Sequence, residues 1–216
     1  MLIDLVDDLR CPRPHEPTWL VASADRTDGR DIVEGTLGCP ICHAEYPIRA
    51  GVVWFRRPSG ETWHAEGIQP APDAEAAMRL AAFLDLSDAR GFALLAGSWA
   101  GAAPLLRDLV PTHLVVLDPT PGIASGQGIS ALEVETAIPL ADAACRGVAL
   151  DARHAVPAYV DDAVRVLRPR GRLVAPASVP IPAGATELAR DGQLWVAERA
   201  TDATGLVPLR PRGSRP

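Results

Sequence analysis

The sequence predicts an α/β protein with a mostly parallel sheet that closes in an antiparallel hairpin, preceded by a small domain rich in cysteine and histidine. Three observations lead to this prediction. From Asp73 onward, helical segments and apolar strand-like segments alternate with short turns. Near the carboxyl terminus two strand-like segments flank an Asp-Gly pair, which is typical of a tight hairpin turn. Three of the four cysteines, Cys11, Cys39 and Cys42, precede residue 56.

Composition divides the 216-residue chain into four parts. Residues 1–55 form the predicted Cys/His domain, and residues 56–72, rich in proline, glycine and polar side chains, form a linker. Residues 73–200 form the α/β domain, and residues 201–216 form a tail without apolar periodicity.

The first half of the α/β domain is predicted to begin with a helix that Asp73 caps and that runs to about Asp88. Gly91 then admits the apolar strand FALLA, which is followed by the Gly-rich turn GSWAG and a second helix ending near Leu109. The apolar strand LVVLD ends on Asp118. The segment PTPGIASGQG after it holds too many glycines and prolines for a full crossover helix, so we expect a short turn or a stunted helix there.

The second half continues the alternation. Its predicted elements are strands over 129–134 and 147–151, a helix over 158–167, a turn over 168–171, a strand over 172–177 and a hairpin of 186–190 with 193–199 around Asp191-Gly192. The order therefore remains α/β to the end of this domain.

Charge and composition exclude several classes of function. Lys and Arg together number 21 against 27 Asp and Glu, so the net charge of −6 disfavours binding to nucleic acid. The sequence contains no lysine, which excludes Schiff-base and P-loop lysine chemistry. No apolar run reaches the roughly 20 residues of a membrane span. The acidic first ten residues do not read as a signal peptide, so we expect a cytoplasmic protein with reduced thiols.

Paired metal-binding residues occur in the Cys/His domain. Cys39 and Cys42 form a C-x2-C pair, and Cys11 and His15 form a C-x3-H pair upstream. Two chelating pairs supply the four donors that tetrahedral Zn²⁺ prefers, and the ion would stabilise a small domain. Three alternatives remain open: a redox pair at Cys39 and Cys42, small buried cysteines without a metal, and substitution of His43 for His15.

The runs LRCPRPH and LGCPICHAEYPIRAGVVWF resemble the zinc-ribbon family of methyltransferase activator subunits. The resemblance covers about Leu2 to Phe55 and implies that Cys11, Cys39 and Cys42 are metal ligands. His15 differs from the usual second cysteine by type and by one extra residue. The resemblance also implies a domain that docks on a methyltransferase partner and stabilises it, here with the partner in the same chain.

Residues 75–199 resemble class I S-adenosylmethionine-dependent methyltransferases, with a Rossmann-like sheet. Four segments carry the likeness: FALLAGSWAG, HLVVLD, AIPLADAACRGVALD and AVRVLRPRGRLVAP. In that family the first loop wraps the methionine part of the cofactor, an acid after the second strand holds the ribose, and a Pro-Leu-x-Asp segment borders the adenine. The cofactor-binding residues that the resemblance implies are Gly97, Trp99, Gly101, Asp118 and Asp142.

Two positions depart from the family loop. Leu95 stands where the family has an acid, and Trp99 stands where it has the central glycine. We expect the Trp99 indole either to occupy the cofactor pocket or to force the loop outward. In an alternative interpretation Gly97 and Gly101 only permit close packing of a strand on a helix, and Asp118 only ends a strand.

The sequence after the fourth strand reads Asp151-Ala152-Arg153-His154 and lacks the Pro-Pro-aromatic signature of amino-group methylation. His154 is the candidate general base, because ligands lie at the carboxyl ends of strands in such sheets.

Two functions remain open. One is a methyltransferase with a built-in zinc-ribbon domain, acting on a small molecule or a protein; the other is a non-catalytic binding or scaffold protein that holds a methyltransferase or another protein partner.

Overall fold

The structure is a computed structural model that describes residues 1–56, 72–119, 122–123, 125–135 and 137–201. The predicted linker, apart from its two ends, and the predicted tail, apart from residue 201, lie outside the described residues. Among the described helices, none has the length and apolar character needed to cross a membrane.

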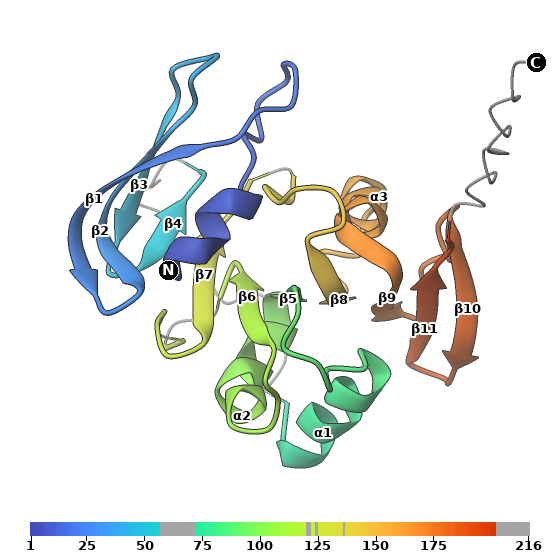
Figure 1. Ribbon diagram of the computed structural model, residues 1–216. Helices are drawn as coiled ribbons and strands as arrows, with labels where there is room; N and C mark the ends of the chain where they lie inside the picture. Colours follow the sequence, from blue (N-terminus) through green and yellow to red (C-terminus); the bar gives the residue numbers. More distant parts are fainter. Residues whose placement is uncertain (57–71, 120–121, 124, 136, 202–216) are drawn as a thin grey trace, which may run out of the picture.

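One sheet of eleven strands runs through the molecule in the order β1-β2-β3-β4-β7-β6-β5-β8-β9-β11-β10 (Figure 1). The strands are β1 Val21–Asp28, β2 Asp31–Gly38, β3 Glu45–Arg49, β4 Val52–Trp54, β5 Phe92–Ala96, β6 His113–Leu117, β7 Ile129–Glu133, β8 Cys145–Ala149, β9 Leu167–Pro176, β10 Ala185–Arg190 and β11 Leu194–Arg199. Strands β5 to β9 pair in parallel, and β11 and β10 close the sheet antiparallel. The predicted fold class, a Rossmann-like sheet with an antiparallel carboxyl-terminal hairpin, is confirmed.

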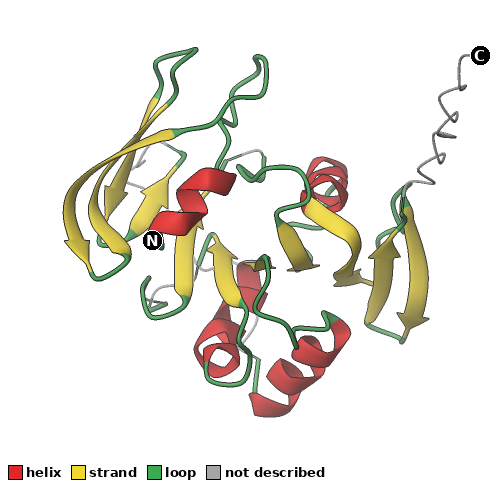
Figure 2. Ribbon diagram, in the orientation of Figure 1, coloured by secondary structure: helices red, strands yellow, loops and turns green. Residues whose placement is uncertain are grey.

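Helices cover both faces of the parallel strands (Figure 2). They are the 3-10 helices η1 Ile3–Asp8 and η2 Gly97–Ala102 and the α-helices α1 Ala74–Phe83, α2 Ala103–Arg107 and α3 Pro157–Val166. Side chains of β5 alternate between the two faces, because successive residues of a strand point in opposite directions. Leu95 packs with α1 and α2, whereas Leu94 packs with α3 and η1, and both are fully buried.

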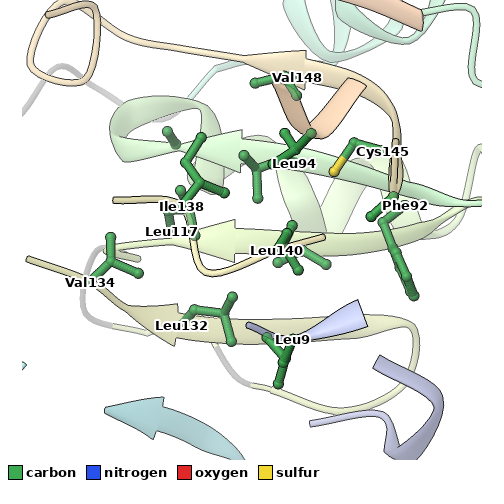
Figure 3. Packing of buried hydrophobic residues seen from close by; sticks show 14 of the residues in the cluster. Leu9, Phe92, Leu94, Leu117, Leu132, Val134, Ile138, Leu140, Cys145 and Val148 are labelled. Atoms are coloured by element: carbon green, nitrogen blue, oxygen red, sulfur yellow. The ribbon is translucent and has the colours of Figure 1, made fainter. Parts of the chain in front are cut away.

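The amino-terminal strands join this sheet directly. Strand β4 pairs in parallel with β7, with Val53 opposite Leu132. Leu9 forms an isolated antiparallel bridge with Leu140 and belongs to the same buried cluster as Leu132 (Figure 3). The Cys/His domain and the α/β domain therefore share both a sheet and a core.

Two local predictions need correction. Helix α1 begins at its predicted cap, where Asp73 accepts a hydrogen bond from the Ala76 N–H, but it ends at Phe83 because Asp85 adopts a left-handed backbone (φ 51°). The predicted turn at 168–171 lies inside β9 as an irregularity in its pairing with β8. The predicted hairpin around Asp191-Gly192 is confirmed, and the Asp191 carboxylate accepts hydrogen bonds from the N–H groups of Gln193 and Leu194 at its turn.

Candidate functional site

The four predicted metal-binding residues come together beside β2 and β3. One donor atom from each of Cys11, His15, Cys39 and Cys42 lies within 4.8 Å of every other. The sulfur atoms of Cys11 and Cys42 are 3.7 Å apart, and Cys39 Sγ lies 3.5 Å from His15 Nε2. In a tetrahedron with metal–sulfur bonds of about 2.3 Å and metal–nitrogen bonds of about 2.0 Å, the ligand atoms are separated by about 3.5 to 3.8 Å. The cluster therefore has the donors and the spacing to hold a metal ion.

Neighbouring groups orient these donors. His15 Nδ1 lies 2.6 Å from the Glu16 carbonyl oxygen, so it donates there and leaves Nε2 with its lone pair toward the cluster. The Tyr46 hydroxyl lies 3.2 Å from Cys11 Sγ. Burial raises the pKa of Cys39, but hydrogen bonds from the N–H groups of Cys42 and Ile41 outweigh it and lower that pKa to about 7. Such support favours the thiolate form that binds metals.

A second polar site lies at the carboxyl ends of the parallel strands, where β5 is flanked by β6 and β8. After β5 the chain forms β6 and β7 on one side of β5, and it then crosses over to form β8 on the other side. This is the switch point of the sheet, where α/β proteins of this kind bind ligands. Asp118 follows β6, Gly97 follows β5, and Asp151 and His154 follow β8.

Ion pairs between this chain's own side chains connect these loops. His154 Nδ1 lies 2.7 Å from Asp151 Oδ1, and His154 Nε2 lies 3.1 Å from Asp118 Oδ2. Asp118 Oδ1 accepts from the Val134 N–H at 2.9 Å, and Asp151 Oδ2 accepts from the Ser98 N–H at 2.9 Å. The three side chains are at most 9% exposed. Both oxygens of Asp118 are thus engaged.

The charge of His154 follows from these contacts. Burial lowers the pKa of its imidazole, but the hydrogen bonds and charges of Asp118 and Asp151 outweigh burial and raise that pKa to about 9. Burial also raises the pKa of Asp151, and the hydrogen bonds from His154 and Ser98 hold it below its usual range. At neutral pH the imidazole is therefore a cation between two carboxylates, and it lacks the lone pair of a general base. The Tyr159 ring meets it edge-on at 5.4 Å between centroids.

Two further charged residues, Glu133 and Arg56, lie beside Asp118. Glu133, at the end of β7, forms an ion pair with Arg56, and both side chains are less than 15% exposed. Burial raises the pKa of Glu133 to about 7, against the opposing charge of Arg56, and a hydrogen bond shared with Asp118 adds to the increase. We call Asp118, His154, Asp151, Glu133 and Arg56 the crevice network.

As arranged here, the candidate cofactor-binding residues make contacts within the chain. A ribose diol would donate to carboxylate oxygens, and each oxygen of Asp118 already has one partner within the chain. Gly97 has a left-handed backbone (φ 60°), and a Cβ built on it would lie 2.0 Å from Asp151 Oδ2. The backbone of the Gly-rich turn therefore approaches the Asp151 carboxylate closely.

The other predicted cofactor residues make different contacts. The Trp99 ring packs against the apolar cluster beneath α1 and α2, and Leu95 is buried in the same cluster. Gly101 lies within η2. The Asp142 side chain is 76% exposed and pairs with Arg165 at 3.0 Å. The groups that meet Gly97 and Asp118 are thus carboxylates, an imidazole and a backbone N–H rather than the predicted indole.

Sequence reasoning did not single out Asp151, Glu133 or Arg56. One signal for Asp151 was present, since VALD and LVVLD are both apolar strands that end on an aspartate. Because parallel strands end at the same edge of a sheet, two such acids converge when their strands flank a common neighbour. The pairing of Asp118 with His154, in contrast, depends on loop conformation that no local pattern encodes.

No family model matches this sequence, and no curated protein matches it. Several solved methyltransferase structures match part of it. A geranyl diphosphate methyltransferase in complex with S-adenosylmethionine is 13% identical, with a TM-score of 0.40, over 47% of this chain and 48% of its own. A putative methyltransferase from Bacillus halodurans C-125 is 22% identical, with a TM-score of 0.37, over 48% of this chain and 49% of its own.

A methyltransferase from Geobacter sulfurreducens is 10% identical, with a TM-score of 0.44, over 61% of this chain and 81% of its own. The chain spans about half the length of the first of these structures. With TM-scores below 0.5, these likenesses carry no inference about what the chain binds or does.

Proposed function

We propose that this chain is a methyltransferase-like protein that does not transfer methyl groups, a binding protein whose former cofactor crevice is closed by its own ion pairs. The observation that carries the proposal is the engagement of both Asp118 oxygens, one by the Val134 N–H and one by His154. A ribose would have to displace a charged, hydrogen-bonded imidazole from a site that is almost fully buried. Breaking such a pair costs about 3 to 5 kcal/mol, which is a large penalty on cofactor affinity.

The Gly-rich turn supports the same proposal. The Ser98 N–H donates to Asp151 Oδ2, so a backbone donor of this turn already has a carboxylate partner. The methionine end of the cofactor carries its own carboxylate, which would compete with Asp151 for that donor. Leu95, fully buried among apolar side chains, supplies no acid to balance the cofactor's ammonium group.

In this proposal the Cys/His cluster holds a structural Zn²⁺. A tetrahedral ion bound by three thiolates and one imidazole would fix the loops that carry Cys11 and Cys39 and would stabilise the amino-terminal strands. The redox alternative is less well supported, because Cys42 and Cys11 lie at ligand spacing from each other and His15 completes the set. Zinc content by elemental analysis tests this assignment: one ion per chain is expected, with loss in Cys39→Ser and retention in His43→Asn.

The pairing of β4 with β7 supports a role for the Cys/His domain inside this chain. Strand β7 would be the edge of the parallel sheet without β4, and unpaired edges are prone to aggregate. A zinc-stabilised domain docked there would act on its own α/β domain. A partner protein held by this chain would then bind another surface.

A second candidate function is S-adenosylmethionine-dependent methyl transfer to a small molecule or a protein. The observation that favours it is the position of Asp118, an acid directly after β6 beside the switch point of the sheet. For this function His154 must leave Asp118, so that the carboxylate can accept the ribose hydroxyls. Activity would then require an open form of the crevice.

Calorimetric titration of the zinc-loaded full chain with S-adenosylmethionine separates the two candidates. Our proposal predicts millimolar or undetectable affinity, whereas micromolar affinity would support the methyltransferase and overturn the proposal. His154→Ala removes the residue that engages Asp118, and His43→Asn is a matched change at an exposed histidine. A gain of cofactor binding in His154→Ala alone would support the closure of the crevice by His154.

A further inference from the structure

The sulfur atoms of the Cys/His cluster differ in their exposure and in their neighbours. Cys11 and Cys39 are 8% and 2% exposed, whereas Cys42 is partly exposed. The sulfur atoms of Cys11 and Cys42 lie 3.7 Å apart. Cys39 Sγ instead accepts a hydrogen bond from the Cys42 N–H at 3.4 Å and lies 3.5 Å from His15 Nε2. Cys42 is therefore the most accessible cysteine of the cluster, and the Cys11 sulfur lies in contact with its sulfur.

Two cavities border this cluster. One has a volume of about 660 Å³ and is lined in part by Cys11 and His15. The other has a volume of about 570 Å³ and is lined in part by Cys39 and Pro40. Each is many times larger than the roughly 30 Å³ that a water molecule occupies in the liquid, so a small oxidant can reach the cluster.

Backbone hydrogen bonds hold the two segments that carry these sulfur atoms. The Cys11 N–H donates to the Thr18 carbonyl at 3.2 Å, in the loop before β1. The Cys39 N–H donates to the Ala44 carbonyl at 2.9 Å, in the turn between β2 and β3. Because the sulfur atoms take no part in these bonds, the bonds can persist when the sulfurs react. A disulfide needs the sulfurs of Cys11 and Cys42 to approach by about 1.7 Å, from 3.7 Å to about 2.0 Å.

We propose that Cys42 is an oxidation site, at which hydrogen peroxide joins Cys42 to Cys11 in a disulfide and the bound Zn²⁺ is released. The Cys42 thiolate attacks one peroxide oxygen, the O–O bond breaks, and a sulfenic acid and a hydroxide form. The Cys11 thiolate then attacks the sulfenic sulfur, the S–S bond forms, and a second hydroxide leaves. The two sulfurs lose two electrons and the two oxygens gain them, so the zinc keeps its charge. Cys39 stays reduced, which distinguishes this pair from a C-x2-C redox pair.

The disulfide removes two of the four metal donors. Cys39 and His15 remain, and a structural zinc site needs four ligands, so the ion is lost. The disulfide connects the same two segments that the ion connects, so we expect the amino-terminal strands to stay folded. A dithiol reductant restores the thiolates and the site. This inference rests on the structural Zn²⁺ of the proposed function, and it does not depend on whether the crevice binds S-adenosylmethionine.

The test treats the reduced, zinc-loaded full chain with hydrogen peroxide. A zinc-sensitive dye follows the ion, and a thiol reagent counts the cysteines that remain reduced. We expect one ion to be released as two thiols are lost, and both changes to reverse with dithiothreitol and added Zn²⁺. Thiol loss with the ion retained, or no thiol loss at millimolar peroxide, would overturn the proposal. A reduced chain without zinc would instead overturn the metal assignment of the proposed function, and peptide mapping would then test the disulfide by itself.

Peptide mapping identifies the cysteine pair. The chain has no lysine, so trypsin cleaves it after arginine alone, and the bond before Pro14 resists cleavage. Cys11 therefore lies on residues 11–26, and Cys39 and Cys42 both lie on residues 31–49. The expected product is a link between these two peptides, with Cys39 free to be alkylated before reduction. A disulfide within residues 31–49, or a link with Cys42 left free, would overturn the proposal.

Two variants test which cysteine reacts. Cys42→His keeps four donors but lacks the accessible thiol, so it is expected to retain its zinc at the peroxide concentration that empties the wild type. Cys145→Ser removes a fully buried cysteine of β8 and is expected to release zinc as the wild type does. Zinc release from Cys42→His at the wild-type rate would contradict the assignment. Thermal unfolding checks that each variant is folded, and the wild-type map decides the proposal without either of them.

Discussion

His154 Nε2 lies 3.1 Å from Asp118 Oδ2, and this contact joins the loop after β8 to the end of β6 across the end of β5. The other ring nitrogen of His154, Nδ1, lies 2.7 Å from Asp151 Oδ1. A single cation thus connects the loops of two strands that are not neighbours in the sheet. We therefore expect the stability of this edge of the sheet to depend on that side chain.

Replacement of His154 by glutamine is expected to lower the free energy of unfolding by about 3 kcal/mol, because it leaves the buried carboxylates of Asp118 and Asp151 without their cation. Urea denaturation at neutral pH measures the change. His43→Asn is the control, since His43 is exposed and has a left-handed backbone (φ 55°) that asparagine tolerates. Equal stability of the His154 variant and the wild type would show that the ion pairs contribute little.

The contribution of His154 depends on pH. Its pKa is about 9 in the folded chain and about 6.5 in an unfolded one, so the folded state holds this proton more tightly. The stabilisation is therefore fully present below pH ~6.5 and is lost as the pH rises through ~9. Urea denaturation of the wild type and of His154→Gln across this range is expected to give a stability difference that shrinks with rising pH. A difference that grows would contradict the assigned charge.

Gly97→Ala is expected to destabilise the protein more than Gly29→Ala. Both glycines have left-handed backbones, with φ of 60° and 58°, so both substitutions carry the same backbone cost of about 1 to 2 kcal/mol. Only at Gly97 does the added methyl group meet the Asp151 carboxylate, since nothing lies within 4 Å of a Cβ at Gly29. Thermal denaturation of the two variants measures the difference. Equal losses would mean that the Gly-rich turn stands clear of Asp151.

Zinc release and loss of the sheet are expected to coincide during unfolding. Leu5, Leu9 and Val53 of the amino-terminal region share one buried cluster with Leu132 and Leu140, so the two regions should unfold together. A zinc-sensitive dye and far-ultraviolet circular dichroism, followed in the same urea titration, report the two events. Metal release at clearly lower urea than the loss of circular dichroism would show that the Cys/His domain unfolds independently.

Local patterns predicted the elements and the metal-binding residues. The strand FALLA, the Asp73 cap and the C-x2-C pair depend on neighbouring residues, and each appears where the sequence indicates. The crevice network depends instead on which loops meet. Asp118 and His154 were each identified as site residues, but with separate roles, because their 36-residue separation gives no sign of a hydrogen bond.

Local patterns also do not show which way the side chains of Leu95 and Trp99 point. In the sequence analysis, these two residues depart from the family loop and are expected to hinder cofactor binding. In the structure Leu95 faces the cluster beneath α1 and α2, so an acid at this position would be buried among apolar groups. Strand alternation assigns Leu94 and Leu95 to opposite faces, but it does not say which face borders the crevice.

Nuclear magnetic resonance of ¹⁵N-histidine-labelled protein tests most directly whether His154 closes the crevice. The expected result is a His154 imidazolium with both ring nitrogens protonated at neutral pH, a pKa near 9, and signals that do not change when millimolar S-adenosylmethionine is added. His154→Gln identifies the signals. A neutral imidazole that titrates near its ordinary pKa, or a shift of its signals with added S-adenosylmethionine, would contradict the account.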